Sequence, residues 1–301
     1  MTRRYLGLRL ILTGALLPAC LAAQQDNAAK LPQGLVAPGA QLVRLPGEYS
    51  FTEGPAADKA GNVYFTDIPA NRIYKWSLDG TVSPFREDTG GANGLYFDKR
   101  GHLIACQGGL GKMASIAPTG ALTPIAEEFE GKRFNSPNDL WVDPQGGVYF
   151  TDPVYGRRTV VQGGEHVYYV PPDHSSVVRV IDDMVRPNGL IGTPDGKTLY
   201  VTDHGAKRTY RYAVCEDGTL KDKTLFCDVG CDGMTRDTRG NLYLAEADII
   251  VFDADGKRLG VIDIPQRPTN VCFGGAQGKT LFVTARTAVY TLQMAIAGQN
   301  R

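Results

Sequence analysis

Short apolar runs joined by glycine-containing turns recur along most of this chain. Asn138 opens Asn-Asp-Leu-Trp-Val-Asp, a turn follows at 144–147, and the run 148–152 returns as Val-Tyr-Phe-Thr-Asp. The same order of polar residue, apolar run, turn and returning run begins at Asn188 and again at Asp232. Runs rich in β-branched and aromatic residues around such turns are typical of β-hairpins. The pattern therefore predicts a repeated antiparallel unit.

The unit occurs six times, and each copy begins at a residue whose side chain carries an oxygen. These residues are separated by 40, 45, 50, 44 and 38 positions, and they are Glu53, Asn93, Asn138, Asn188, Asp232 and Asn270. Units of about 40 residues with three or four strands have the size of propeller blades. We therefore predict an all-β, six-bladed β-propeller over residues 40–301, with segment 41–45 as the outermost strand of the last blade. A β-sandwich or a solenoid fits the near-constant spacing less well, and no long amphipathic helix supports an α/β barrel.

The six oxygen-bearing residues are expected to meet at one end of the central channel. The first strand of a blade lies innermost, so a residue at its start points towards the axis. A single Asn-Gly or Asp-Gly pair is as well explained by a hairpin turn. Here, however, the pairs precede the first strand, and another glycine turn serves the hairpin. The loops after the second strands return to the same end and bring Tyr155 and His204 there, although rim packing and loop capping are the simpler roles for these two.

Glu53 and Asp232 would repel each other in a narrow channel unless a cation balanced their charges. Two carboxylates with the amides of Asn138 and Asn188 form an all-oxygen site, which suits Ca²⁺ with its six to eight oxygen ligands. Mg²⁺, Mn²⁺ and Zn²⁺ are alternatives, as is a solvated funnel without metal. A cation that polarises a carbonyl, beside Asp232 as a base for water, predicts hydrolysis. The chain has no Gly-x-Ser-x-Gly motif for a serine nucleophile.

The N-terminal residues differ from the rest of the chain. Arginines precede an apolar run at 10–17 and small residues follow, which predicts a secretory signal peptide over residues 1–23 and a flexible leader over 24–39. Residues 17–20 also match a lipoprotein signal with Cys20 as the lipid-carrying residue, so export to the periplasm or medium, with or without a lipid anchor, is expected. The run is too short for a membrane span. Basic and acidic residues number 32 each, which gives no charge excess for binding nucleic acid.

Four segments resemble the SMP-30/gluconolactonase family, and the resemblance extends over about residues 40–292. They are Phe-Thr-Glu-Gly-Pro at 51–55, Phe-Asn-Ser-Pro-Asn-Asp-Leu at 134–140, Arg-Pro-Asn-Gly-Leu at 186–190 and Cys-Asp-Gly-Met at 231–234. The resemblance implies a six-bladed propeller that hydrolyses a sugar lactone to the aldonic acid with calcium or another divalent ion. It assigns metal ligation to Glu53, Asn188 and Asp232, and the catalytic base to Asp232.

Substrate contacts are less uniform within the family. Asn138 matches a position that binds metal or substrate, whereas Ser136 stands where some members have an arginine. We expect Arg133, Asn93, Asn138, Tyr155 and His204 on the substrate side. The alternatives are a broader lactonase or organophosphate hydrolase with the same metal site, and a non-catalytic propeller that binds a ligand or protein.

Overall fold

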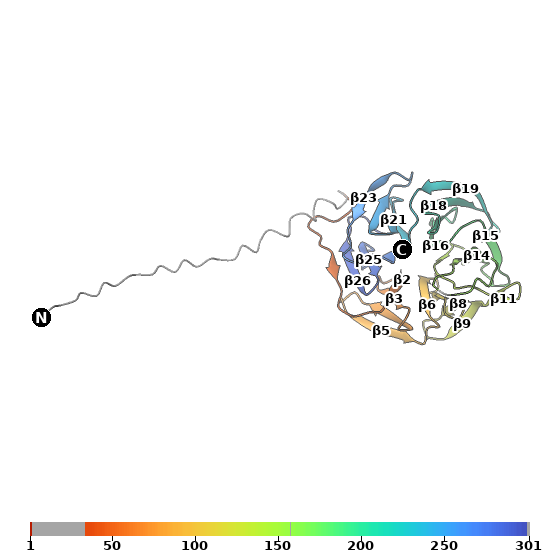
Figure 1. Cartoon of the computed structure of the whole chain (residues 1–301), viewed down its shortest axis with the longest axis horizontal. Coiled ribbons are helices and arrows are strands. Elements are labelled where there is room, and N and C mark those ends of the chain that lie inside the picture. The colour runs from red at the N-terminus through yellow and green to blue at the C-terminus, as the bar shows by residue number, and fades with distance from the viewer. Residues whose placement is uncertain (2–33, 157, 300–301) are drawn as a thin grey trace.

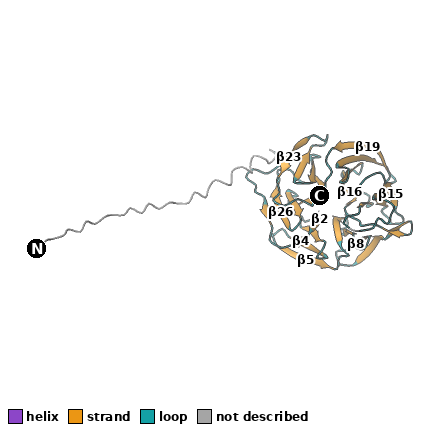
Figure 2. Ribbon diagram, viewed as in Figure 1, coloured by secondary structure: helices purple, strands orange, loops and turns teal. Residues whose placement is uncertain are grey.

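The computed structural model describes residue 1 and residues 34–156 and 158–299. Six four-stranded antiparallel sheets are arranged radially around a central axis, as Figures 1 and 2 show. The described residues contain strands and turns but no helix. The six-bladed, all-β fold predicted from the repeat is confirmed.

The blades follow one another along the chain. Blade 1 comprises β2 (Thr52–Ala57), β3 (Val63–Asp67), β4 (Arg72–Trp76) and β5 (Val82–Glu87), and blade 2 comprises β6 (Ala92–Phe97), β7 (Leu103–Gln107), β8 (Lys112–Ile116) and β9 (Leu122–Ala126). Blade 3 comprises β12 (Leu140–Val142), β13 (Val148–Asp152), β14 (His166–Val170) and β15 (Val178–Ile181), and blade 4 comprises β16 (Pro187–Gly192), β17 (Thr198–Asp203), β18 (Arg208–Val214) and β19 (Leu220–Cys227). Blade 5 comprises β20 (Met234–Arg236), β21 (Leu242–Ala245), β22 (Ile249–Phe252) and β23 (Arg258–Ile262).

Blade 6 joins the two ends of the propeller. It consists of β24 (Asn270–Gly274), β25 (Thr280–Ala285), β26 (Ala288–Gln293) and the N-terminal strand β1 (Val43–Arg44), which pairs with β26. The closing strand predicted from residues 41–45 is therefore present. Leu35 is buried and Val36 pairs with Met294, so contact with the last blade starts before residue 40. Closure removes a free sheet edge.

The apolar core lies between the blades. Five buried clusters each join neighbouring blades, and together they cover the whole circle: blades 3 to 5, 5 to 6, 6 to 1, 1 to 2 and 2 to 3. A blade alone exposes both apolar faces of its sheet, so it is stable only between two neighbours. The channel residues are consequently held by the packing of the entire ring.

Blades 2 and 3 contain the insertions that lengthen the repeat. A small hairpin, β10 (Glu128–Phe129) and β11 (Lys132–Arg133), lies between them, and a long loop at 153–165 joins β13 to β14. These additions account for the spacings of 45 and 50 residues. They also place extra chain at the channel end where the first strands begin.

The predicted signal peptide, its Cys20 alternative and most of the predicted leader lie outside the described residues. Within the part of the chain that the structure describes, no helix has the length and apolar character needed to cross a membrane.

Candidate metal centre in the channel

The first strands of neighbouring blades approach each other closely at the oxygen-bearing residues. The N–H of Gly94 donates to the carbonyl of Asn138 (2.7 Å), and the N–H of Gly189 donates to the carbonyl of Asp232 (2.7 Å). A Cβ on Gly189 would lie 2.6 Å from that Asp232 carbonyl oxygen, and one on Gly94 would lie 2.6 Å from the Asn138 oxygen. The glycine after the polar residue therefore permits contact between blades. The hairpin-turn explanation of these Asn-Gly pairs is wrong.

Threonine–aspartate pairs at the ends of the second strands fix the loops that lead into the first strands. The buried carboxylate of Asp203 accepts the N–H groups of Val185 (2.9 Å) and Arg186 (3.0 Å), just before Asn188. Asp67 and Asp152 make the same two contacts in blades 1 and 3. A carboxylate that accepts two backbone donors restrains both residues that it contacts. This arrangement sets the position of the oxygen-bearing side chains.

Two predicted ligands, Glu53 and Asp232, share one electrostatic environment in the channel. Burial raises the pKa of Glu53 well above its ordinary value, and the neighbouring charge of Asp232 raises it further. The pKa of Asp232 is raised to about 6 by burial, against a hydrogen bond from Asn188 that lowers it. Glu53 is 3% exposed. The structure thus couples a buried Glu53 to a partly exposed Asp232, two acids that are 179 residues apart in the sequence.

Asp139 is a third carboxylate in this environment, and the sequence analysis did not identify it. Burial raises its pKa to about 7, and the charge of Asp232 contributes; its own charge raises the pKa of Glu53. Strand alternation would have turned the residue after Asn138 away from the channel, but β12 begins only at Leu140. The sequence does contain one signal. The residue after the oxygen-bearing residue is glycine in blades 1, 2, 4 and 5 but aspartate in blade 3.

The remaining members of the predicted ring differ in how they contact these acids. The Asn270 amide hydrogen-bonds to Glu53 and donates to Asp139 (3.4 Å), so it joins two of the carboxylates. Asn138 is buried beside Asp139 and holds its place through backbone bonds. Asn93 is half-buried, and its carbonyl accepts the hydroxyl of Thr66 (3.1 Å). These contacts involve backbone atoms, so the roles of the Asn93 and Asn138 side chains stay predictions.

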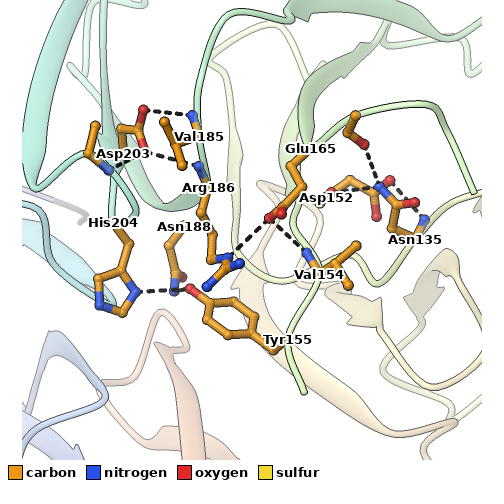
Figure 3. A network of polar contacts seen from close by, with 12 residues as sticks. Asn135, Asp152, Val154, Tyr155, Glu165, Val185, Arg186, Asn188, Asp203 and His204 are labelled. Carbon is orange, nitrogen blue, oxygen red and sulfur yellow. Dashed lines mark hydrogen bonds and ion pairs between the residues drawn. The ribbon is translucent and has the colours of Figure 1, made fainter. Parts of the chain in front are cut away.

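A chain of polar contacts runs from Asp232 to the rim. The Asn188 amide nitrogen donates to Asp232 Oδ1 (2.6 Å). It also donates to the Tyr155 hydroxyl (2.6 Å), which in turn lies 3.0 Å from Nδ1 of His204 (Figure 3). Burial lowers the pKa of His204, which favours the neutral ring. A hydroxyl that accepts from Asn188 has its own proton available for a neutral imidazole nitrogen. Tyr155 and His204 thus orient Asn188.

Arg186 packs against the ring of Tyr155. Its guanidinium lies 5.1 Å from the centre of the Tyr155 ring, and its Nε contacts Glu165 (3.3 Å). Glu165 also accepts the N–H of Val154 (2.9 Å), next to Tyr155 (Figure 3). The Tyr155 loop is consequently held to blade 4 by a stacked cation and an ion pair.

Arg133 does not join the cluster through its observed contacts. It lies on β11, and its Nη1 donates to the carbonyls of Phe134 (2.9 Å) and Asn135 (3.1 Å). A different arginine, Arg158 from the 153–165 loop, reaches Ser136 and the carbonyl of Gly108 (2.8 Å). The guanidinium beside Ser136 therefore belongs to a loop that is distant in sequence. The short sequence motif around Ser136 does not reveal this contact.

The donor set fits a hard cation. Among the described residues no three His, Cys, Asp or Glu side chains are grouped for metal binding, but the predicted set requires only two acids with amide oxygens. Carboxylates whose pKa values rise mainly through burial, and for Glu53 also through the charge of Asp232, gain from a cation between them. The amide nitrogen of Asn188 is used by Asp232 and Tyr155, and oxygen is the amide atom that binds hard cations.

A six-bladed propeller with acids and amides converging on its axis defines the structural class. The family model for the SMP-30/Gluconolactonase/LRE-like region matches residues 51–287, and the chain belongs to that family. It is 32% identical over 277 residues to a gluconolactonase from Zymomonas mobilis, a match that covers 80% of this chain and 78% of the relative.

Solved structures agree with this assignment. A gluconolactonase from Xanthomonas campestris superposes with a TM-score of 0.80 at 32% identity, over 86% of this chain and 91% of that one. A calcium-binding regucalcin from Agrobacterium tumefaciens shares the fold, with a TM-score of 0.71 at 20% identity over 90% of this chain and 96% of that one.

Proposed function

We propose that this protein hydrolyses a sugar lactone, of the gluconolactone type, to the aldonic acid with the help of a divalent cation, most simply Ca²⁺, in the channel. The observation that supports the proposal is the hydrogen bond from Asn188 to Asp232 together with the electrostatic coupling of Asp232 to the buried Glu53. The gluconolactonases from Zymomonas mobilis and Xanthomonas campestris support the substrate class. The calcium-binding regucalcin supports the choice of cation.

Glu53, Asn188 and Asp232 would hold the cation, with Asn138 as a further ligand or a substrate contact. When bound, such a cation supplies a Lewis acid for the lactone carbonyl. Asp232 accepts the proton of the attacking water, which requires its ionised form. Its hydrogen bond from Asn188 favours that form.

The rim groups position the substrate. The hydroxyl of Tyr155, the ring of His204 and the amide of Asn93 offer donors and acceptors to the hydroxyl groups of a sugar ring. The Arg158 guanidinium beside Ser136 adds a cation at the same end of the channel. Tyr155 lies on a loop held by an ion pair and His204 follows the aspartate that fixes its loop, so little ordering of these two is required when the substrate binds.

The proposal is tested by acid release from a panel of aldonolactones, before and after removal of divalent cations. Hydrolysis by the wild type should disappear with a chelator and return with Ca²⁺. Asp232→Asn should reduce kcat/KM by about 10²–10⁴-fold, the range for loss of a general base. Asp228→Asn is the matched control, because Asp228 is exposed and its carboxylate pairs with Arg208 on the outside of blade 4 (3.6 Å).

Two results would contradict the proposal. Lactone hydrolysis that is unaffected by chelation would exclude the cation from the reaction. Absence of hydrolysis across the panel, in protein that binds Ca²⁺, would favour phosphotriester substrates or a non-catalytic binding role.

A further inference from the structure

The channel has a second ring of side chains, further along the innermost strands. These residues follow the oxygen-bearing residue by three positions in blades 1 to 5 and by two in blade 6, and they are Ala56, Tyr96, Trp141, Ile191, Thr235 and Cys272. All six line a cavity of about 550 Å³. The turns of the first hairpins also line it, at Asp58, Asp98 and Asp143. The cavity therefore opens at the end of the channel opposite the loops of Tyr155 and His204.

Asp139 and Asn270 separate this cavity from the candidate metal centre. Both line the cavity, and the Asn270 amide contacts both Asp139 and Glu53 of the candidate metal centre. The channel is thus divided into an oxygen-rich compartment and a compartment with a mostly apolar wall. A molecule in the second compartment need not displace a cation from the first.

The acidic groups at the rim of the cavity are already satisfied by their own turns. Asp58 accepts three backbone N–H groups and the amide of Asn62, and Asp143 accepts three backbone N–H groups and the hydroxyl of Tyr169. Asp98 accepts two backbone N–H groups and Arg100. Their charges are therefore offset by local donors, which leaves less repulsion for an anion near the rim.

Arg236 contributes a positive charge to the same wall. Its Nη1 donates to the neutral amide oxygen of Gln299 (2.7 Å), and its buried Nε has no hydrogen-bond partner. A buried guanidinium nitrogen without an acceptor is costly. Nε itself is shielded from the cavity, so an anionic group there would balance the charge of the half-buried side chain rather than accept from Nε.

The C-terminal segment limits access to the cavity. Gln299 donates from its amide to the carbonyl of Gly192 in blade 4 (2.7 Å) and accepts from Arg236 in blade 5. Gly298 and Gln299 both line the cavity. The C-terminal segment therefore forms part of the wall at this mouth.

We propose that this cavity is a second ligand site, which binds a small aromatic molecule carrying one anionic group. The volume falls within the range of small-molecule pockets, roughly 300–1,000 Å³. Tyr96 and Trp141, which are hydrogen-bonded to each other, provide aromatic surface, and Arg236 provides the counter-charge. The inference does not depend on the proposed lactonase activity, because it concerns other side chains and the opposite mouth.

The test is a titration of the intact protein with 1-anilinonaphthalene-8-sulfonate, followed by dye fluorescence and by calorimetry for stoichiometry. Saturable binding to one site is expected. Cys272→Phe, which fills the cavity, should weaken binding by about tenfold or more, on the scale of a lost aromatic contact. Cys215→Phe is the matched control, since Cys215 lies in an outer turn of blade 4, and it should bind as the wild type does.

The charge requirement has its own comparison. The uncharged analogue N-phenyl-1-naphthylamine should bind more weakly than the sulfonate, and Arg236→Gln should remove the difference. If Cys272→Phe does not fold by circular dichroism, Thr235→Leu fills the same cavity and takes its place. No saturable binding to the wild type, or equal binding by a folded cavity-filling variant, would overturn the proposal, and equal affinity for both dyes would overturn its anionic part.

Discussion

At the scale of single residues, this site depends on glycine as much as on acids and amides. Gly54, Gly94, Gly189 and Gly233 each lie where a Cβ would come within 2.6 Å of the next blade. They let neighbouring backbones touch, which draws the oxygen-bearing side chains onto one axis. Asp139 stands at the corresponding position of blade 3 and fills the channel with a carboxylate instead.

Gly189→Ala should destabilise the protein and impair the site together. The new methyl group would overlap the Asp232 carbonyl and push blades 4 and 5 apart, at about 1–3 kcal/mol for overpacking. Thermal unfolding and lactone turnover measure the two effects. In the control Gly80→Ala, the new Cβ meets nothing within 4 Å, but the alanine backbone must adopt the positive φ of 88° found at Gly80. The free energy of unfolding of that control should fall by about 1–2 kcal/mol, and its turnover should be unchanged. Equal turnover in the two variants would contradict the predicted effect of Gly189→Ala on the site.

Tyr155→Phe should weaken cation binding without disturbing the fold. It removes the hydroxyl that accepts from Asn188 and contacts His204, and loss of such an outer partner typically costs about 10–100-fold in metal affinity. Calorimetric titration with Ca²⁺ gives the change. Tyr168→Phe in the same blade is the control, because the buried hydroxyl of Tyr168 has no partner. Unchanged affinity in Tyr155→Phe would show that Asn188 does not need the tyrosine.

At the scale of the element, the innermost strands of blades 1, 3 and 4 are positioned from two sides. The aspartate at the end of the second strand holds the loop before the first strand, and backbone bonds between blades hold its beginning. The strand pairing alone does not set this geometry, because blades 1, 2 and 4 each contain an irregularity in register just after the oxygen-bearing residue. The bulge changes the direction of the strand where the ligand must point inwards.

Asp203→Ala should therefore act on Asn188, which lies 15 residues away in sequence. The N–H groups of Val185 and Arg186 would lose their charged acceptor, and hydrogen bonds to charged groups contribute about 1.5–3 kcal/mol. Both stability and Ca²⁺ affinity should fall. Asp195→Ala changes an exposed turn of the same blade, where Asp195 accepts from Thr193 and Lys197, and should leave the affinity unchanged. If Asp203→Ala lost stability but kept full Ca²⁺ affinity, the loop would not control the position of Asn188, and the prediction would be contradicted.

At the scale of the whole molecule, the closed ring of blades holds like charges together. In the absence of a cation, this lowers the free energy of unfolding. Glu53, Asp139 and Asp232 titrate above their unfolded values because burial penalises their ionised forms. The energy to hold them so close comes from the interblade core, to which every blade contributes.

The cation-free protein should lose stability as the pH rises. An acid whose folded pKa exceeds its unfolded value binds more protons when folded, so stability is highest below the unfolded pKa, about 4, and falls as pH rises to the folded values. Those values are about 6 for Asp232 and about 7 for Asp139. Thermal unfolding after chelation should show this decline, and added Ca²⁺ should raise the unfolding temperature more at the higher pH. A rise in stability over this range in the chelated protein would contradict the assignment of buried, unpaired acids.

The sequence predicted the fold because strand periodicity and turn chemistry define the hairpins, and the near-constant spacing of the repeat defines a common axis. The contacts that link Asn188, Asp232 and Glu53 agree with the predicted ring, whose role in metal binding stays a prediction. Asp139 and Arg158 were not predicted, since one precedes the regular strand and the other reaches the site from a long loop. Arg133 stays a prediction as a substrate contact, although its observed hydrogen bonds are to its own backbone neighbours.

Anomalous diffraction from crystals soaked in Mn²⁺ tests the central claim most directly. The account predicts one strong peak in the channel, bordered by the carboxylates of Glu53 and Asp232 and the amide oxygen of Asn188, and its loss in Glu53→Gln. An empty channel in crystals that contain the ion, or a peak bound elsewhere without these three side chains, would contradict it.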